Sequence, residues 1–159
     1  MENGRGKKYY AAHGFFINTA RMADMCPTAA GMGAGELKGY RLLFRGAHAE
    51  AVAALEPDKD ATISVLVWEI TTADEAALDI CEGFPVRCRK ETVKVKLDGK
   101  AASAMVYIMN EETPPGRPGA YHYESILEGY EAAGFDTETL RKALLTSVEM
   151  AEAIGDWMQ

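Results

Sequence analysis

Two segments of the chain alternate between apolar and polar residues in the manner of half-buried strands. Residues 62–70 are rich in β-branched side chains, and residues 90–97 alternate one by one. Asp98-Gly99 follows the second segment and is a strong hairpin signal, so residues 104–109 are predicted to return as its partner strand. Shorter apolar segments predict two further strands, over residues 8–12 and 36–44.

Capping residues and the helical spacing of apolar residues predict four helices. Asn18 and Asp136 are candidate N-caps for the first and the last of them. Thr72, with Glu75 three residues later, fits a capping box for the second. The predicted helices span residues 19–25, 72–81, 121–133 and 136–154.

Four other segments carry turn or loop signals, or are ambiguous. The Gly-Met-Gly-Ala-Gly of residues 31–35 lacks the lysine of a phosphate-binding loop and the spacing of a dinucleotide fingerprint. We therefore expect a flexible loop without a ligand there. Residues 57–60 are predicted to form a turn, and residues 113–119, with three prolines, a loop. Residues 50–55 fit a strand or a helix, and their alanines favour the helix.

The order of these elements predicts an α+β fold, in which a mixed β-sheet is curled or closed and helices pack around it. The chain has 159 residues, which is the usual length of one domain. We therefore expect residues 1–159 to form a single domain.

Composition and charge exclude several classes of function. Hydrophobic residues make up 48 % of the chain, which excludes intrinsic disorder, and the net charge of −7 argues against nucleic acid and anionic membranes as partners. The chain contains no apolar run near the roughly 18 residues of a membrane span and no secretion signal, so we expect a cytoplasmic protein. Its cysteines, Cys26, Cys81 and Cys88, are odd in number and form no CxxC, which argues against a disulfide scaffold or a zinc site.

Glu82 is the most interesting acid of the chain, and the residues alone leave two interpretations of it. It follows an apolar helix and precedes Gly83-Phe84-Pro85, a position from which its carboxylate can enter an apolar cavity. Burial there would raise its pKa and make it a usable general base near neutral pH. The alternative, which is the commoner case, is a surface carboxylate at a helix end, where the helix dipole disfavours it.

Two aromatic segments are further candidates. His13-Gly14-Phe15-Phe16 follows the first strand, and a glycine there lets backbone N–H groups approach a ligand closely. The alternative is a plain turn whose aromatic residues enter the core. Tyr121-His122-Tyr123 follows the Pro/Gly loop; its hydroxyls can bind a substrate carboxylate or amide, or its rings can pack the helical tail.

Nucleophilic and metal chemistry find less support. Cys81 and His13 are a conceivable nucleophile–base pair, but Cys81 lies on an apolar helix, which favours a buried structural thiol. His13, His48 and His122 show no spacing typical of metal ligands, so no metal site is expected.

An ordered set of short motifs between Tyr9 and Leu145 resembles the γ-glutamylcyclotransferase-like family. Each motif alone is weak, and the order makes the set specific. The motifs lie at residues 10–14, 21–22, 26–27, 37–44, 67–71 and 78–85, and from Tyr123 through Gly129-Tyr130 to Gly134-Phe135-Asp136.

The resemblance implies a small mixed β-barrel with helices packed around it, and an enzyme that cyclises a γ-glutamyl group to 5-oxoproline and releases an amine or amino acid. It implies a small-molecule γ-glutamyl substrate and no cofactor, and it leaves a homodimer open. The catalytic glutamate falls on Glu82, and the substrate-binding positions fall on His13, Gly14, Phe15, Phe16 and Tyr123.

Two alternatives to the enzyme stay open. The family's substrate loop usually has the sequence Tyr-Gly-Ser-Asn, and large aromatic residues, Phe15 and Phe16, replace its two small polar ones here. Cys88 stands where a tyrosine is usual. These changes are compatible with a relative that binds a small molecule without catalysis. An interaction domain is the other alternative, and no feature of the sequence favours it.

Overall fold

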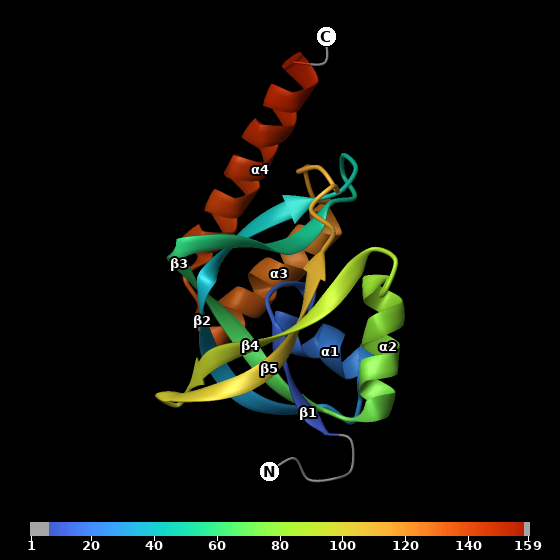
Figure 1. Cartoon of the computed structure of the whole chain (residues 1–159), viewed down its shortest axis with the longest axis vertical. Coiled ribbons are helices and arrows are strands. Elements are labelled where there is room, and N and C mark those ends of the chain that lie inside the picture. The colour runs from blue at the N-terminus through green and yellow to red at the C-terminus, as the bar shows by residue number, and fades with distance from the viewer. Residues whose placement is uncertain (1–6, 158–159) are drawn as a thin grey trace.

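The computed structural model describes residues 7–157, which form a barrel with helices around it (Figure 1). The four predicted helices are confirmed, with small differences at their ends. In chain order the elements are β1 (Lys8–Ala12), a short 3-10 helix η1 (Phe15–Ile17), α1 (Thr19–Met25), β2 (Ala30–Arg45), β3 (Val52–Ile70), α2 (Thr72–Glu82), β4 (Cys88–Leu97), β5 (Lys100–Met109), α3 (Ala120–Ala133) and α4 (Thr137–Trp157).

The strands form a closed barrel in the order β1-β3-β2-β4-β5. Four of the five pairings are antiparallel, and the fifth, between β1 and β5, is parallel and closes the barrel where Tyr10 lies beside Met105. The predicted mixed, closed sheet is therefore confirmed. So is the β4–β5 hairpin, whose turn residues Asp98 and Gly99 both have positive φ, as a type I′ turn requires.

The glycine-rich stretch of residues 31–35 is part of a strand, so the prediction of a flexible loop was wrong. β2 begins at Ala30 and pairs through this stretch with the end of β3, for example Gly31 with Trp68. The absence of side chains leaves room for the large residues of the neighbouring strand: a Cβ on Gly35 would lie 3.2 Å from Val67. Pairing with a distant strand thus overrides the weak local preference of glycine.

Residues 52–60 also belong to a strand, so neither the favoured helix over 50–55 nor the turn over 57–60 is present. β3 runs without interruption from Val52 to Ile70 and pairs with β2 along most of its length. Pro57 pairs with Tyr40 next to a shift in the register between Lys38 and Tyr40. A proline fits a strand at such an irregularity, because the regular ladder of hydrogen bonds is already interrupted there.

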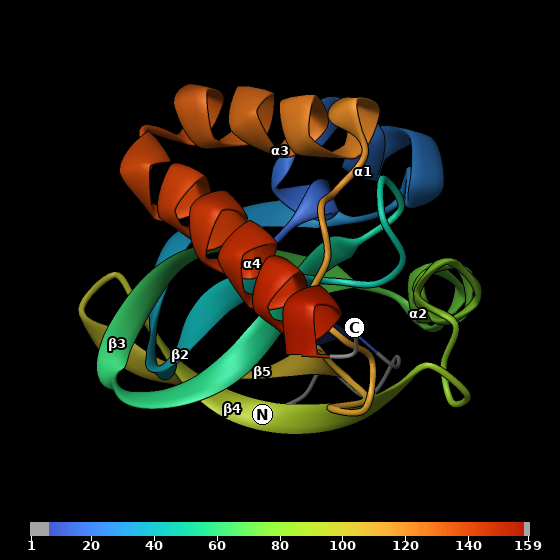
Figure 2. The same ribbon diagram turned by 90° about the horizontal axis from the view of Figure 1, so that it is seen from above.

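Alternating residues of the strands build two apolar cores. One set fills the barrel and includes Ala11, Val65, Val67 and Val106. Their sequence neighbours point outward and pack under the helices, together with buried residues such as Phe44, Ile126, Tyr130 and Leu140. Seen from above, α3 and α4 cross one side of the barrel and α2 lies on another (Figure 2).

The helix caps tie these layers together. The Asn18 side chain accepts hydrogen bonds from the N–H groups of Ala20 and Arg21, at 3.1 and 3.2 Å, which confirms it as an N-cap. Its amide also donates to the Ser125 carbonyl of α3, at 2.8 Å. Asp136 caps α4 through the N–H of Glu138, at 3.0 Å, as predicted. The cap of α1 therefore joins it to α3, next to the segment that follows β1.

Candidate active site

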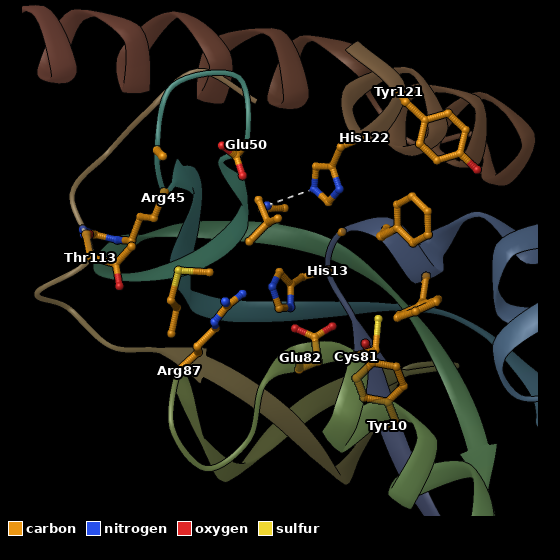
Figure 3. Close-up of a pocket in the computed structure, with 18 residues that line it drawn as sticks. Tyr10, His13, Arg45, Glu50, Cys81, Glu82, Arg87, Thr113, Tyr121 and His122 are labelled. Carbon is orange, nitrogen blue, oxygen red and sulfur yellow. Dashed lines mark hydrogen bonds between the residues drawn. The ribbon is translucent and has the colours of Figure 1, made fainter. Parts of the chain in front are cut away.

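A cavity of about 620 Å³ opens between the β1–η1 segment, the end of α2, the β2–β3 loop and the start of α3 (Figure 3). Segments far apart in the sequence meet there. Its lining consists of Tyr10, His13, Gly14, Phe15, Phe16, Arg45, Gly46, Ala47, Glu50, Val52, Ala53, Cys81, Glu82, Arg87, Met109, Thr113, Tyr121 and His122. Four of the predicted substrate-binding residues and the predicted catalytic glutamate therefore share one cavity.

Glu82 is the last residue of α2 and turns its carboxylate into this cavity, toward His13 (Figure 3). Gly83 ends the helix with a φ of 74°, which lets the chain leave without covering the carboxylate. Burial raises the pKa of Glu82 from 4.5 to about 7. Of the two interpretations of Glu82, the structure supports the carboxylate in a cavity.

Polar contacts hold α2 against the barrel and so set the position of Glu82. Lys90 on β4 binds Glu75 at 2.6 Å and Asp79 at 2.9 Å. The Tyr107 hydroxyl donates to Asp79 at 2.6 Å, and Asp79 lies one helical turn before Glu82. At the other end, the capping box consists of Thr71 and Asp74. The prediction of Thr72 and Glu75 was wrong by one residue, because β3 extends to Ile70 and the helix begins at Thr72.

The segment His13–Phe16 forms a tight turn on the opposite side. Gly14 lies so close to β3 that a Cβ on it would be 2.7 Å from that of Ala53. The Ile17 N–H donates to the Gly14 carbonyl at 2.9 Å, and the Trp68 indole donates to the Phe16 carbonyl at 3.0 Å. The carbonyls of the turn thus accept hydrogen bonds, and Ile17 is the first residue whose N–H donates one within it. The N–H groups of residues 14–16 come before this residue and have no acceptor within the turn, as at the start of any helix.

Two histidines line this side in their neutral form. Burial lowers the pKa of His13 and of His122 from 6.5 to about 4. His122 accepts a hydrogen bond from the Ala53 N–H at 3.2 Å, and its ring stacks on Phe15 with centroids 5.4 Å apart. His13 Nδ1 is buried and has no hydrogen-bond partner within residues 7–157.

Tyr123 lies outside the cavity lining, unlike the other predicted substrate-binding residues. It packs partly buried against the helical core, with its ring 5.9 Å from that of Phe44. Tyr121 and His122, from the same turn of α3, face the cavity instead. Each residue of a helix is rotated by about 100° from the last, so a position two residues away points to another side.

Cys81 is exposed and lines the cavity, so the prediction of a buried thiol was wrong. Leu78, three residues earlier, is fully buried against the barrel. By Cys81 the helix has passed the edge of the core and reached the cavity. The residue as a whole is exposed, but the cavity wall partly desolvates its thiol, and this desolvation together with the neighbouring Glu82 raises the pKa of Cys81, so it is a poor thiolate nucleophile.

Sequence reasoning missed several charged and polar residues of the lining, notably Arg45, Arg87, Glu50 and Tyr10. Arg45 is buried and already paired, with Glu56 at 2.6 Å and with the Thr113 carbonyl at 2.7 Å. Burial, reinforced by the nearby Glu82, raises the pKa of Tyr10 and keeps its hydroxyl protonated. These residues come from four separate segments, and only the fold brings them together.

Comparison with known proteins identifies the family. The sequence pattern described as gamma-glutamyl cyclotransferase, AIG2-like, matches residues 13–131. The chain belongs to this family. A search of curated proteins finds no match.

Within residues 7–157, no helix is long and apolar enough to cross a membrane, and no group of three or more His, Cys, Asp or Glu side chains is arranged to hold a metal ion.

Solved structures share the fold of this family member. The uncharacterized protein loc79017 from Homo sapiens has a TM-score of 0.75 and 22 % identity, covering 87 % of this chain and 86 % of that one. A structure named gamma-glutamyl cyclotransferase has the same TM-score and identity, over 86 % of each chain. YkqA from Bacillus subtilis has a TM-score of 0.74 and 20 % identity, and the match covers 86 % of this chain and 52 % of YkqA.

Proposed function

We propose that this chain cyclises the γ-glutamyl group of a γ-glutamyl amine or amino acid to 5-oxoproline and releases the amine. The observation that carries the proposal is the Glu82 carboxylate, which faces the cavity and has a pKa of about 7. The chain also belongs to the gamma-glutamyl cyclotransferase, AIG2-like family. A group with this pKa exchanges protons readily in both directions at neutral pH. A single carboxylate can therefore act first as base and then as acid.

The chemistry of the proposed reaction is an intramolecular transfer. The α-amine of the substrate attacks its own γ-carbonyl carbon, a new C–N bond closes the five-membered ring, and the bond to the leaving amine breaks. Both reacting groups belong to one substrate molecule. Holding the substrate in the bent conformation that brings its amine to its γ-carbonyl therefore supplies much of the rate enhancement. Glu82 accepts the proton of the attacking amine and returns it to the leaving nitrogen. No redox step or group carrier enters this balance.

The turn at Gly14 lies opposite Glu82 and supplies hydrogen-bond donors for the negative charge that forms during the reaction. Negative charge develops on the γ-carbonyl oxygen as the ring closes, and fixed N–H donors stabilise such charge. The N–H groups of Gly14, Phe15 and Phe16 precede the first hydrogen bond of the turn, no side chain caps this short helix at Gly14, and Gly14 itself borders the cavity. We assign the oxyanion to this turn.

The aromatic residues of the turn are compatible with catalysis. Phe16 is 2 % exposed and packs into the core, while Phe15 stacks on His122. The two rings are thus held by other side chains, and the backbone of the turn still borders the cavity. This arrangement favours the enzyme over the relative that binds without catalysis.

The test is release of 5-oxoproline from a panel of γ-glutamyl amino acids and γ-glutamyl amines, measured by liquid chromatography. We expect release by the native protein and a loss of about 10²- to 10⁴-fold in kcat for Glu82→Gln, the range for removing a general acid–base. Glu124→Gln, which changes an exposed glutamate of α3 outside the cavity lining, is the matched control and retains activity.

Two results would contradict the proposal. If Glu82→Gln releases 5-oxoproline at the native rate, Glu82 is not the acid–base. If no member of the panel is turned over while circular dichroism shows a folded protein, the alternative of binding without catalysis is favoured.

A further inference from the structure

Among the residues that the structure describes, Arg87 is the cation of the cavity lining that has no ion-pair partner. Two arginines line it, and Arg45 is occupied by Glu56 and the Thr113 carbonyl. The Arg87 guanidinium forms no ion pair within residues 7–157, although it enters the same space as Glu82 and His13 (Figure 3). Since both histidines of the lining are neutral near pH 7, Arg87 is the positive group available to a ligand there.

The backbone of Arg87 is held on both sides. Its N–H donates to the Gly83 carbonyl at 2.8 Å, and its carbonyl accepts from the Asn110 N–H at 3.0 Å. The Asn110 side chain also donates to the Val86 carbonyl at 2.8 Å. The stem of Arg87 lies over Gly83, where a Cβ would come within 2.8 Å of it. The backbone and the stem of this exposed arginine are therefore held at the edge of the cavity, which removes part of the entropy cost of binding a ligand.

Glu82 and Arg87 are neighbours without being partners. The two side chains form no ion pair, and burial is the cause of the raised pKa of Glu82. Each group thus remains available, one for a proton and the other for an anion. A glutamyl group carries its α-amine and its α-carboxylate on the same carbon, so a ligand whose amine faces Glu82 presents a carboxylate only two bonds from that amine.

We propose that Arg87 binds the α-carboxylate of the γ-glutamyl group while Glu82 faces the α-amine. This inference rests on the proposed function and names the part of the substrate that the site recognises. A planar guanidinium matches a carboxylate with two parallel hydrogen bonds. Two attachment points on one carbon fix the direction from which the amine attacks, so Arg87 acts as a substrate-binding and positioning residue.

A binding experiment tests the role of Arg87 even though the amine that the substrate releases is not identified. Every γ-glutamyl substrate yields the same product, 5-oxoproline, which keeps the α-carboxylate and so can serve as the probe. The probes are 5-oxoproline and 5-oxoprolinamide, whose carboxamide has no charge, and the readout is calorimetry or NMR titration. We expect the native protein to favour the acid by about 10- to 100-fold, the range for hydrogen bonds to a charged group. Arg87→Gln is expected to lose this preference, and Arg87→Lys to keep part of it.

Arg141→Gln on α4 is the matched control, since Arg141 is exposed and pairs only with Glu138 within the described residues. It retains the native preference. Equal binding of acid and amide by the native protein, no binding of 5-oxoproline, or an unchanged preference in Arg87→Gln would each overturn the inference.

The kinetic arm separates failure of this inference from failure of the proposed function. A γ-glutamyl amine and its α-carboxamide are compared as substrates, so neither carries a carboxylate on the leaving group. We expect kcat/KM to fall by about 10- to 100-fold on amidation in the native protein and to change little in Arg87→Gln. If 5-oxoproline is released but both proteins respond alike, the function stands and the role of Arg87 does not. If nothing is released, the function fails, and the titration still reports whether Arg87 binds a carboxylate.

Discussion

The two sides of the cavity are built in different ways. The aromatic wall, His13–Phe16 with His122, is fixed by packing: Gly14 touches Ala53, Phe16 is buried, and Phe15 stacks on His122. The charged wall, Glu82–Arg87, is fixed by backbone hydrogen bonds from Phe84 to Asp79 and from Arg87 to Gly83, both within 2.9 Å. Side-chain packing therefore determines the shape of the aromatic wall. In the charged wall, backbone hydrogen bonds hold the turn, so the side chains of Glu82 and Arg87 are left to face the cavity.

The difference extends to pH. Burial favours the neutral form on both walls, but neutral histidine has lost a proton and neutral glutamic acid has kept one. His13 and His122, with a pKa of about 4 in the fold and 6.5 when unfolded, contribute stability that is full above pH 6.5 and lost toward pH 4. Glu82, with a pKa of about 7 in the fold and 4.5 when unfolded, contributes stability that is full below pH 4.5 and lost as pH rises through 7. Acid therefore weakens one wall and base the other.

The largest expected effect is the acid response of the aromatic wall. The pKa of each histidine is 6.5 in the unfolded chain and about 4 in the fold, and each pKa unit corresponds to about 1.4 kcal/mol. Each histidine therefore lowers the free energy of unfolding by up to about 3 kcal/mol as the pH falls from 6.5 to 4. We expect the double variant His13→Asn, His122→Gln to lose less stability than the native protein over this range, as measured by urea unfolding at each pH. Parallel pH curves for the two proteins would show that the histidines are solvated in the fold.

Glu82→Gln is expected to strengthen the charged wall at alkaline pH while it removes activity. The amide has the same shape and no charge, so above pH 7 the variant gains up to about 3 kcal/mol over the native protein, and the gain disappears below pH 4.5. Urea unfolding at pH 4 and pH 8 measures both ends. Glu124→Gln controls for loss of a surface charge, and a variant less stable than native at pH 8 would contradict a buried carboxylate.

Gly14→Ala is expected to have a smaller effect, confined to the aromatic wall. The added methyl group would lie 2.7 Å from the Cβ of Ala53, an overlap that costs about 1–3 kcal/mol in a packed site. Ala53→Gly removes the opposing atom, so the double variant recovers most of the stability lost by Gly14→Ala. Chemical unfolding of the four proteins gives the coupling energy, and purely additive losses would mean that the contact is relieved in another way.

Features set by neighbouring residues were predicted well from the sequence. The N-caps Asn18 and Asp136 and the hairpin at Asp98-Gly99 each depend on a few consecutive residues, and the structure has all three. Glu82 is an intermediate case: the neighbouring residues predicted the helix end and the glycine after it, but they left a surface carboxylate as the commoner interpretation, and the fold turns the side chain into the cavity. Its role in catalysis stays a prediction.

Features set by distant contacts were predicted poorly. Residues 31–35 form a strand because Trp68 and Val67 lie beside them, and the ends of α2 and α3 depend on where the barrel stops. For this reason Cys81 is exposed and Tyr121 rather than Tyr123 lines the cavity. Arg87 carries no local signal at all, since only the folded turn turns it toward Glu82.

The hydrogen bond from the Trp68 indole to the Phe16 carbonyl gives the molecule an optical reporter of its own site. Trp68 is 7 % exposed, and it touches the turn to which we assign the oxyanion. The chain has one other tryptophan, Trp157, at the far end of α4. With Trp157 replaced by phenylalanine, the fluorescence of a single indole follows the aromatic wall directly, so motion of the turn during binding becomes visible without any added label.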